Sequence, residues 1–114
     1  TVIAPQVRKE LWELYQNYEK QLSIEQRAYQ YGEIQKQGVY LVLAATDDRQ
    51  VNQMISTECS QKDVMVNNAS DSSQCDFYFP ALVEREGLVM GVTSIDGNHK
   101  KVAEFCGRLR GKEL

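Results

Sequence analysis

The chain has 114 residues, of which 42% are hydrophobic and 25% are charged, and its formal net charge is -3. This composition is typical of one globular domain and excludes a disordered chain. The acidic balance argues against a nucleic-acid-binding protein, and no apolar run approaches the roughly 18 residues of a membrane span. Three cysteines without CxxC spacing predict neither a disulfide framework nor a metal site, so we expect a cytoplasmic protein.

The first quarter of the chain predicts a strand, a helix and a second strand. Residues 1–4 form a short strand that Pro5 ends, because proline cannot donate a hydrogen bond to a ladder. Apolar residues then recur at helical spacing over residues 7–18, and residues 22–27 alternate like an edge strand. Residues 29–37 are polar and ambiguous, with a single helical turn as one interpretation. Because the chain opens on a strand without an initiator methionine, we expect that it begins inside a domain.

The centre of the sequence is an aliphatic run that ends in small and polar residues. Residues 39–44 predict a strand that is covered on both faces, as in parallel α/β sheets. Ala45, Thr46, Asp47 and Asp48 follow it. In open α/β sheets ligands bind outside the carboxyl ends of the strands, so these residues are the first candidates for a functional site.

A second helix and strand follow this polar tip. Val51, Met54 and Ile55 form one apolar stripe of a helix over residues 49–62, and Asp47 with Gln50 has the spacing of a capping box. Residues 64–66 predict the next strand, which ends in a polar loop over residues 67–73. This alternation of strands and helices predicts a right-handed parallel sheet.

The last third predicts an antiparallel hairpin and a helix. Residues 77–83 and 88–93 form two strand-like runs, and their connection is short enough only for a hairpin. Asn98 is predicted to start the final helix and Gly111 to end it. A hairpin and one helix cannot bury both faces, so we expect them to pack on a second copy of the chain or on a following domain. The predicted fold class is α/β: a truncated Rossmann-like parallel sheet over residues 1–75, then a dimerisation hairpin and helix over residues 76–114.

Four short motifs in the right order resemble one family. Residues 44–48 (Ala-Ala-Thr-Asp-Asp), residues 51–53 (Val-Asn-Gln), Val66-Asn67 and residues 75–81 (Cys-Asp-Phe-Tyr-Phe-Pro-Ala) resemble the N-terminal domain of siroheme synthases and the precorrin-2 dehydrogenases. This resemblance implies a homodimer with exchanged hairpins that oxidises the tetrapyrrole precorrin-2 to sirohydrochlorin with NAD. In some members this activity is joined to chelation of ferrous iron.

The resemblance also implies site residues. Cofactor contacts fall on Pro5, Ala45, Thr46, Asp47 and Asn67, and a substrate contact falls on Ser94. The family usually has a catalytic Asp at the position of Ser70, and Asp71 follows here, so Ser70 and Asp71 are the catalytic candidates. A carboxylate there would accept the proton released during hydride removal, and its pKa would have to lie near the working pH.

Other interpretations remain open at this point. Asp47 has the position of a helix cap and Asp71 that of an ordinary loop residue. The glycine-rich turn of the family lies before Thr1, and Pro5-Gln6 does not distinguish NAD from NADP. The chain could therefore be a non-catalytic dimeric relative, or a different NAD(P)-binding regulatory domain. The single histidine, His99, is predicted to be a surface residue. Cys59 and Cys106 are predicted to pack in the core.

Overall fold

The structure is a computed structural model that describes residues 1–35 and 37–111. Position 36 of the ambiguous polar segment therefore lies outside the described residues. The chain divides into two compact units, Thr1–Phe77 and Tyr78–Leu114. The first unit contains β1 (Val2–Ala4), α1 (Lys9–Asn17), β2 (Ile24–Gln26), β3 (Leu41–Ala44), α2 (Arg49–Gln61), β4 (Met65–Asn68) and the 3-10 helix η1 (Ser72–Gln74). The second contains β5 (Ala81–Arg85), β6 (Leu88–Val92) and α3 (His99–Arg110).

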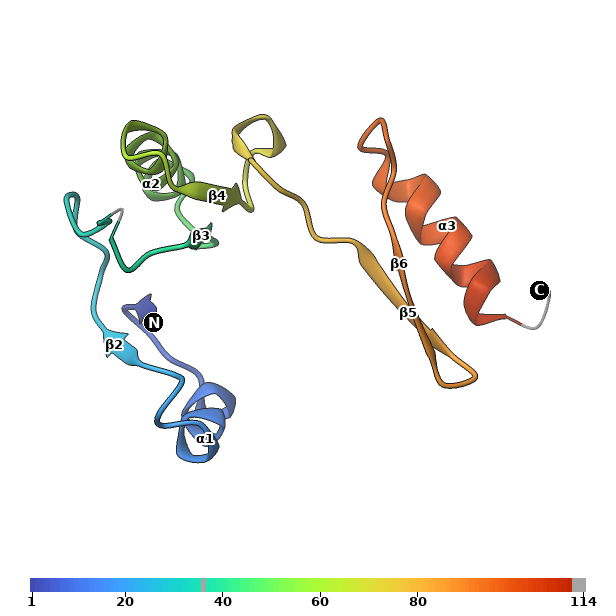
Figure 1. Cartoon of the computed structure of the whole chain (residues 1–114), viewed down its shortest axis with the longest axis horizontal. Coiled ribbons are helices and arrows are strands. Elements are labelled where there is room, and N and C mark those ends of the chain that lie inside the picture. The colour runs from blue at the N-terminus through green and yellow to red at the C-terminus, as the bar shows by residue number, and fades with distance from the viewer. Residues whose placement is uncertain (36, 112–114) are drawn as a thin grey trace. The chain divides into compact units, whose positions relative to one another are not determined.

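The strands of the first unit form two parallel pairs. β1 pairs with β2, and β3 pairs with β4 in the register Leu41↔Met65 to Ala44↔Asn68. A helix connects the strands of each pair (Figure 1). Parallel strands require such a crossover, and the alternation of elements in the sequence predicted it correctly.

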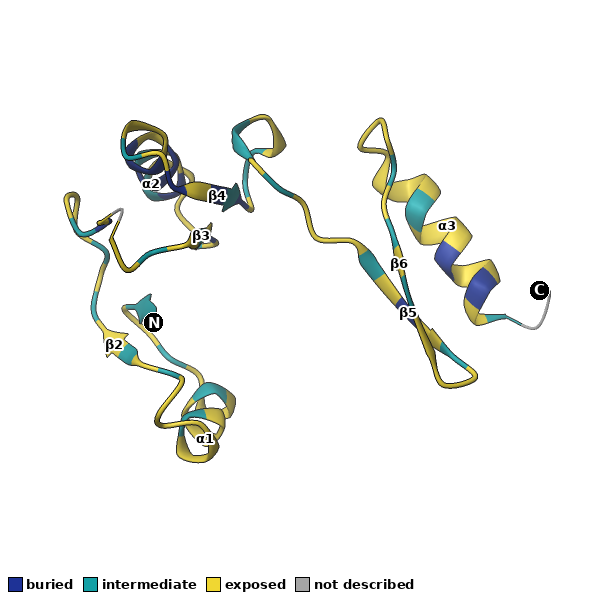
Figure 2. Ribbon diagram, viewed as in Figure 1, coloured by how far each residue is buried: buried dark blue, intermediate teal, exposed yellow. Residues whose placement is uncertain are grey.

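The core of the first unit lies between the β3–β4 pair and α2. Its buried residues are Ile34, Ala44, Ile55, Cys59, Val64 and Val66. Only one face of β3 is covered, because Leu41 and Leu43 are 41% and 53% exposed (Figure 2). The prediction that this strand is covered on both faces is wrong for the described chain. Side chains alternate across a strand, so the residues that face α2 are buried and the others are not.

A buried carboxylate holds the polar segment before β3. Glu58 on α2 is fully buried and accepts hydrogen bonds from the Tyr29 hydroxyl at 2.6 Å and from the backbone N–H groups of Gly32 and Ile34 at 3.0 and 3.1 Å. The Lys62 ammonium lies 4.0 Å from the same carboxylate and donates to the Ile34 carbonyl at 2.7 Å. The described part of this segment is therefore an anchored loop, and the helical interpretation is wrong.

Helix α2 starts one residue later than the capping-box spacing predicts. Asp48 is its N-cap, with extended backbone angles of φ -106° and ψ 111°. Its carboxylate accepts from the N–H groups of Gln50 at 2.9 Å and Val51 at 3.4 Å. Asp47 lies outside the helix, so the prediction that Asp47 caps it is wrong.

The second unit is the predicted hairpin with a helix on one face. Glu86 and Gly87 form a two-residue turn with φ of 54° and 77°, the left-handed conformation that tight hairpins require. Strand β5 begins at Ala81 rather than at residue 77, since Pro80 has no N–H for the ladder. Helix α3 is capped by the Asn98 side chain, which accepts from the Lys101 N–H at 3.0 Å. Its buried contacts join Val83, Cys106 and Leu109.

No helix in residues 1–35 and 37–111 is long and apolar enough to cross a membrane.

Candidate functional site

The carboxyl ends of β3 and β4 lie side by side. Ala44 pairs with Asn68 in the last register position, and the Ala69 N–H donates to the Ala44 carbonyl at 2.9 Å. The turn after β3 (residues 45–47) and the loop after β4 (residues 69–71) therefore leave the sheet at the same edge (Figure 1). The structure brings together the two segments that contain most of the candidate residues.

Thr46 is held inside the turn by Asn52 of α2. The Asn52 side chain is 1% exposed, accepts from the Thr46 N–H at 2.9 Å and donates to the Thr46 carbonyl at 3.0 Å. The Thr46 hydroxyl lies 2.7 Å from Asn52 Oδ1 and 3.0 Å from the Asp48 carbonyl oxygen. Thr46 thus shapes the turn, while its neighbours Ala45 and Asp47 are exposed.

Ser70 is hydrogen-bonded on both sides. Its hydroxyl accepts from Asn52 Nδ2 at 2.9 Å and donates to Asn68 Oδ1 at 2.9 Å. Its carbonyl oxygen accepts from the Arg49 guanidinium at 2.7 Å. The Ser70 hydroxyl is therefore engaged within the protein, and it links the two loops of the site.

Asp71 is the N-cap of the 3-10 helix η1. Its carboxylate accepts from the Ser73 hydroxyl at 2.6 Å and from the Ser73 N–H at 3.0 Å. These two hydrogen bonds, the hydroxyl first, lower the pKa of the Asp71 carboxyl below its usual range. The group is consequently ionised at neutral pH and is a weak proton acceptor.

Asn67 belongs to β4, whereas the sequence placed it in the loop after the strand. Its amide donates to the Phe77 carbonyl at 2.9 Å. Asp76 exchanges two hydrogen bonds with Val66, a backbone N–H to the Val66 carbonyl at 2.8 Å and a side chain that accepts from the Val66 N–H at 2.9 Å. Asn67 and Asp76 therefore hold residues 76–77 against the edge of β4.

Pro5 lies at the end of β1, in the other strand pair. Its carbonyl accepts from the Gln26 side chain at 3.5 Å. The turn at residues 45–47 follows β3 of the β3–β4 pair, so Pro5 and this turn belong to different strand pairs.

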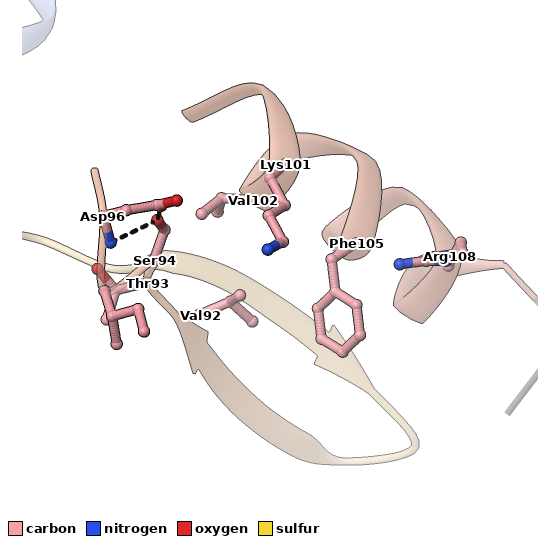
Figure 3. Close-up of a pocket in the computed structure, with 9 residues that line it drawn as sticks. Val92, Thr93, Ser94, Asp96, Lys101, Val102, Phe105 and Arg108 are labelled. Atoms are coloured by element: carbon pink, nitrogen blue, oxygen red, sulfur yellow. Dashed lines mark hydrogen bonds between the residues drawn. The ribbon is translucent and has the colours of Figure 1, made fainter. Parts of the chain in front are cut away.

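Ser94 lies in the second unit, on the wall of an open pocket of about 320 Å³. Figure 3 shows two cations of α3 in this pocket, with Lys101 beside Val102 and Val92 and with Arg108 beside Phe105. The Arg108 guanidinium lies 5.4 Å from the centroid of the Phe105 ring. Two cations beside an apolar wall fit an apolar ligand that carries carboxylates.

The Ser94 hydroxyl caps the loop at the rim of this pocket. It is hydrogen-bonded to the Asp96 carboxylate and accepts from the Asn98 N–H at 2.9 Å. The hydrogen bond from the Ser94 hydroxyl lowers the pKa of the Asp96 carboxyl most, and the hydrogen bond from the Asn98 N–H lowers it further. Asp96 is therefore the one ionised acid in the pocket lining, beside the cations Lys101 and Arg108.

Asn52 is the site residue to which sequence reasoning gave no role. It appeared only as part of the motif at residues 51–53. The available signal was a polar side chain on the apolar stripe of α2, next to Val51 and three residues before Ile55. In residues 1–35 and 37–111, no group of three or more His, Cys, Asp or Glu side chains could hold a metal ion.

Comparison with solved structures shows which fold this arrangement belongs to. A chain described as "SirC, precorrin-2 dehydrogenase" superposes with a TM-score of 0.76 over 98% of this chain and 54% of its own length, at 23% identity. This likeness confirms the Rossmann-like α/β fold class that the sequence predicted.

Comparison with sequences shows the family. A family model described as "Putative NAD(P)-binding" matches residues 1–81. The "Siroheme synthase" of Photorhabdus laumondii is 34% identical over 82% of this chain and 19% of its own length, and that of Pseudomonas fluorescens is 37% identical over the same shares. The chain thus spans about a fifth of these relatives. The predicted likeness to siroheme synthases and the predicted nicotinamide dinucleotide cofactor are both confirmed. The chain belongs to this NAD(P)-binding family.

Proposed function

We propose that the full-length protein oxidises precorrin-2 to sirohydrochlorin in siroheme biosynthesis, with NAD as the hydride acceptor. The observation that carries this proposal is the link from Thr46 through Asn52 to Ser70 at the carboxyl ends of two parallel strands. This is the place where α/β sheets bind nucleotides. The names of the relatives support a role in siroheme biosynthesis, and the name of the similar solved structure supports the choice of precorrin-2 as substrate.

The groups at this edge fit part of a dinucleotide. Ala45 offers a small exposed side chain, and Asp47 offers a carboxylate that makes no hydrogen bond or ion pair within the described residues. A carboxylate accepts hydrogen bonds from ribose hydroxyls, which favours the sugar part of NAD over its phosphates. The Arg49 guanidinium, two residues after Asp47, already donates to the Ser70 carbonyl. Ala45, Thr46 and Asp47 would therefore hold the nucleoside half, with Asn67 and Pro5 further from it.

When bound, NAD supplies a two-electron acceptor for the hydride. One hydride leaves the macrocycle and one proton is released, so the chain needs a group or a water molecule that takes the proton. Asp71 is the candidate, and its lowered pKa makes it a modest base. Ser70 would orient the loop that carries Asp71 rather than transfer a proton, since its hydroxyl is engaged by Asn52 and Asn68.

The pocket beside Ser94 is the candidate contact for the carboxylates of the tetrapyrrole. Lys101 and Arg108 make no ion pair within the described residues, and they line the pocket together with apolar side chains. A tetrapyrrole combines an apolar ring with peripheral carboxylates, which matches both features of the pocket.

The hairpin is the candidate dimer contact. Leu82 and Val89 lie on the face of the hairpin that α3 does not cover, and they are 60% and 66% exposed. Exposed apolar residues next to each other mark interaction sites. We propose a cytoplasmic homodimer that uses this face.

The test uses the full-length protein with precorrin-2 and NAD, and follows the absorbance of sirohydrochlorin and NADH together. We expect both to rise in step, with a lower KM for NAD than for NADP. A later addition of ferrous iron tests for chelation by the appearance of siroheme. A folded, NAD-binding protein that forms neither product would contradict the dehydrogenase proposal.

A second candidate function is that of a non-catalytic dimeric relative. It is favoured by Ser70 in the position of the usual family Asp and by the hydrogen bonds that hold Asp71 ionised. The variant Ser70→Asp discriminates between the two. An aspartate there would restore the carboxylate that the family usually has at this position. Turnover that appears only in Ser70→Asp would support the non-catalytic assignment for the natural chain.

A further inference from the structure

One buried side chain joins the two loops of the candidate site. Asn52 contacts the backbone of Thr46 in the turn after β3 and the hydroxyl of Ser70 in the loop after β4. It makes four hydrogen-bond contacts between 2.7 and 3.0 Å, two of them to Oδ1 and two from Nδ2. Because only 1% of the Asn52 surface is exposed, water cannot replace any of these hydrogen-bond partners.

Backbone groups determine the orientation of this amide. The Thr46 N–H can only donate and the Thr46 carbonyl can only accept, so Oδ1 of Asn52 must face the first and Nδ2 the second. The same reasoning holds for Asn68, whose Oδ1 accepts from the Ser70 N–H at 2.9 Å. The Ser70 hydroxyl therefore accepts from Asn52 and donates to Asn68.

Among similar side chains, only an asparagine satisfies this arrangement. An aspartate has the same shape but lacks the donor for the Thr46 carbonyl, and a leucine leaves two backbone groups unpaired in a buried place. A buried group that loses its partner is far more costly than an exposed one. Changes at Asn52 should therefore disturb both loops at once.

We propose that Asn52 is a positioning residue that holds the cofactor turn at residues 45–47 and the loop at residues 69–71 as one unit. Nucleotide contacts on the first segment are then transmitted to Ser70 and Asp71 on the second. The part of this proposal that concerns the nucleotide rests on the proposed function. The mechanical coupling of the two segments does not.

The main test is Asn52→Asp in the full-length protein, with Gln53→Glu as the control. Both variants exchange an amide for a carboxyl on the same turn of α2, but Gln53 is exposed. At pH 8 we expect Asn52→Asp to raise the Kd for NAD at least tenfold, and Gln53→Glu to change it less than twofold. A tenfold change corresponds to about 1.4 kcal/mol, the range of one lost buried hydrogen bond.

Acidification distinguishes positioning from a general loss of structure. A buried carboxyl has a raised pKa, and in its protonated form it donates to the Thr46 carbonyl as the amide did. At pH 5.5 we therefore expect the Asn52→Asp variant to bind NAD within threefold of the wild-type protein measured at the same pH. A Kd at pH 8 within twofold of wild type, or no recovery at pH 5.5, would overturn the proposal.

Amide hydrogen exchange tests the coupling without any ligand. In Asn52→Asp at pH 8, we expect residues 45–47 and 69–71 to lose protection together, and the β5–β6 hairpin to keep it. Loss in only one of the two segments would overturn the proposal. This result stands whether or not precorrin-2 is oxidised, so failure of the proposed function and failure of this inference are distinguishable.

Ser70→Ala provides the second variant if Asn52→Asp does not fold. It removes the contact from Asn52 to the loop after β4 and leaves the three contacts to Thr46 in place. We expect a two- to fivefold rise in the Kd for NAD, together with faster exchange at residues 45–47. Unchanged binding and unchanged exchange at residues 45–47 would show that the loops are independent and would overturn the proposal.

Discussion

Asp71 shows how local hydrogen bonds set the chemistry of a single residue. The Ser73 hydroxyl and N–H both donate to its carboxylate and lower its pKa. A carboxylate with a depressed pKa is fully ionised at neutral pH, but it binds the proton of a reaction weakly. This environment limits the rate that Asp71 can provide as a base.

Replacement of Asp71 tests this limit. We expect Asp71→Asn to lower kcat about tenfold and to leave the Kd for NAD unchanged. This loss of rate is smaller than the usual loss when a general base is removed, because Asp71 is a modest base. Ser73→Ala is the partner variant, because it removes the stronger of the two hydrogen bonds and so raises the pKa of Asp71. The pH above which kcat is constant should therefore move to a higher value. Steady-state kinetics from pH 3 to pH 7, the range in which a carboxyl with a depressed pKa titrates, provide the measurement. Wild-type turnover in Asp71→Asn would remove Asp71 from the reaction.

Helix α2 illustrates how one residue determines the start of an element. Asp47 and Asp48 are both suitable caps by residue type, but only the Asp48 carboxylate reaches the N–H groups of Gln50 and Val51. We expect Asp48→Ala to lower the free energy of unfolding by about 1 kcal/mol, the usual cost of a lost cap. Asp47→Ala should change it by less than about 0.5 kcal/mol. Urea denaturation of both variants checks this, and equal effects would contradict the assignment of the cap.

Two groups in the core around α2, the Cys59 thiol and the Tyr29 hydroxyl, make the stability of the protein depend on alkaline pH. Burial, reinforced by the charge of Glu58, raises the pKa of the Cys59 thiol to about 11. Burial, and then the hydrogen bond to Glu58, raises the pKa of the Tyr29 hydroxyl above its usual range. Both groups release protons more easily in the unfolded chain. The contribution of Cys59 to stability is therefore complete below pH 9 and is lost as the pH rises to about 11, whereas that of Tyr29 starts to fall near pH 10 and continues to fall at still higher pH.

Thermal unfolding between pH 8 and 11 measures this effect. We expect the melting temperature to fall over this range in the wild-type protein and to fall less in Cys59→Ala, which lacks the buried thiol. The Cys59→Ala variant also has a cavity, which lowers its melting temperature already at pH 8. The melting temperature of each protein is therefore compared with its own value at pH 8. Parallel curves for the two proteins would show that Cys59 does not contribute.

At the scale of the whole molecule, the hairpin provides a test of assembly. We expect Leu82→Glu to convert the proposed dimer to a monomer in sedimentation velocity, because a charge on an apolar contact leaves an unpaired group. Leu14→Glu on α1 is the control, since Leu14 is also a half-exposed leucine but lies in the first unit. A dimer that persists in Leu82→Glu would place the contact elsewhere.

The amino-acid sequence by itself determined the order and type of most elements. Periodicity located α2, β3, the β5–β6 hairpin and α3, because the spacing of apolar residues must match the geometry of each element. The motifs at residues 44–48 and 51–53 also indicated the family. These features are local, so a linear pattern contains them.

The tertiary structure decided what depends on contacts across the chain. It placed Asn67 in β4, exposed one face of β3, and assigned the cap to Asp48. It also revealed the link from Thr46 through Asn52 to Ser70, which joins positions 24 residues apart. Hydrogen-bond partners and burial are properties of the packed arrangement, and spacing along the chain does not specify which side chains meet.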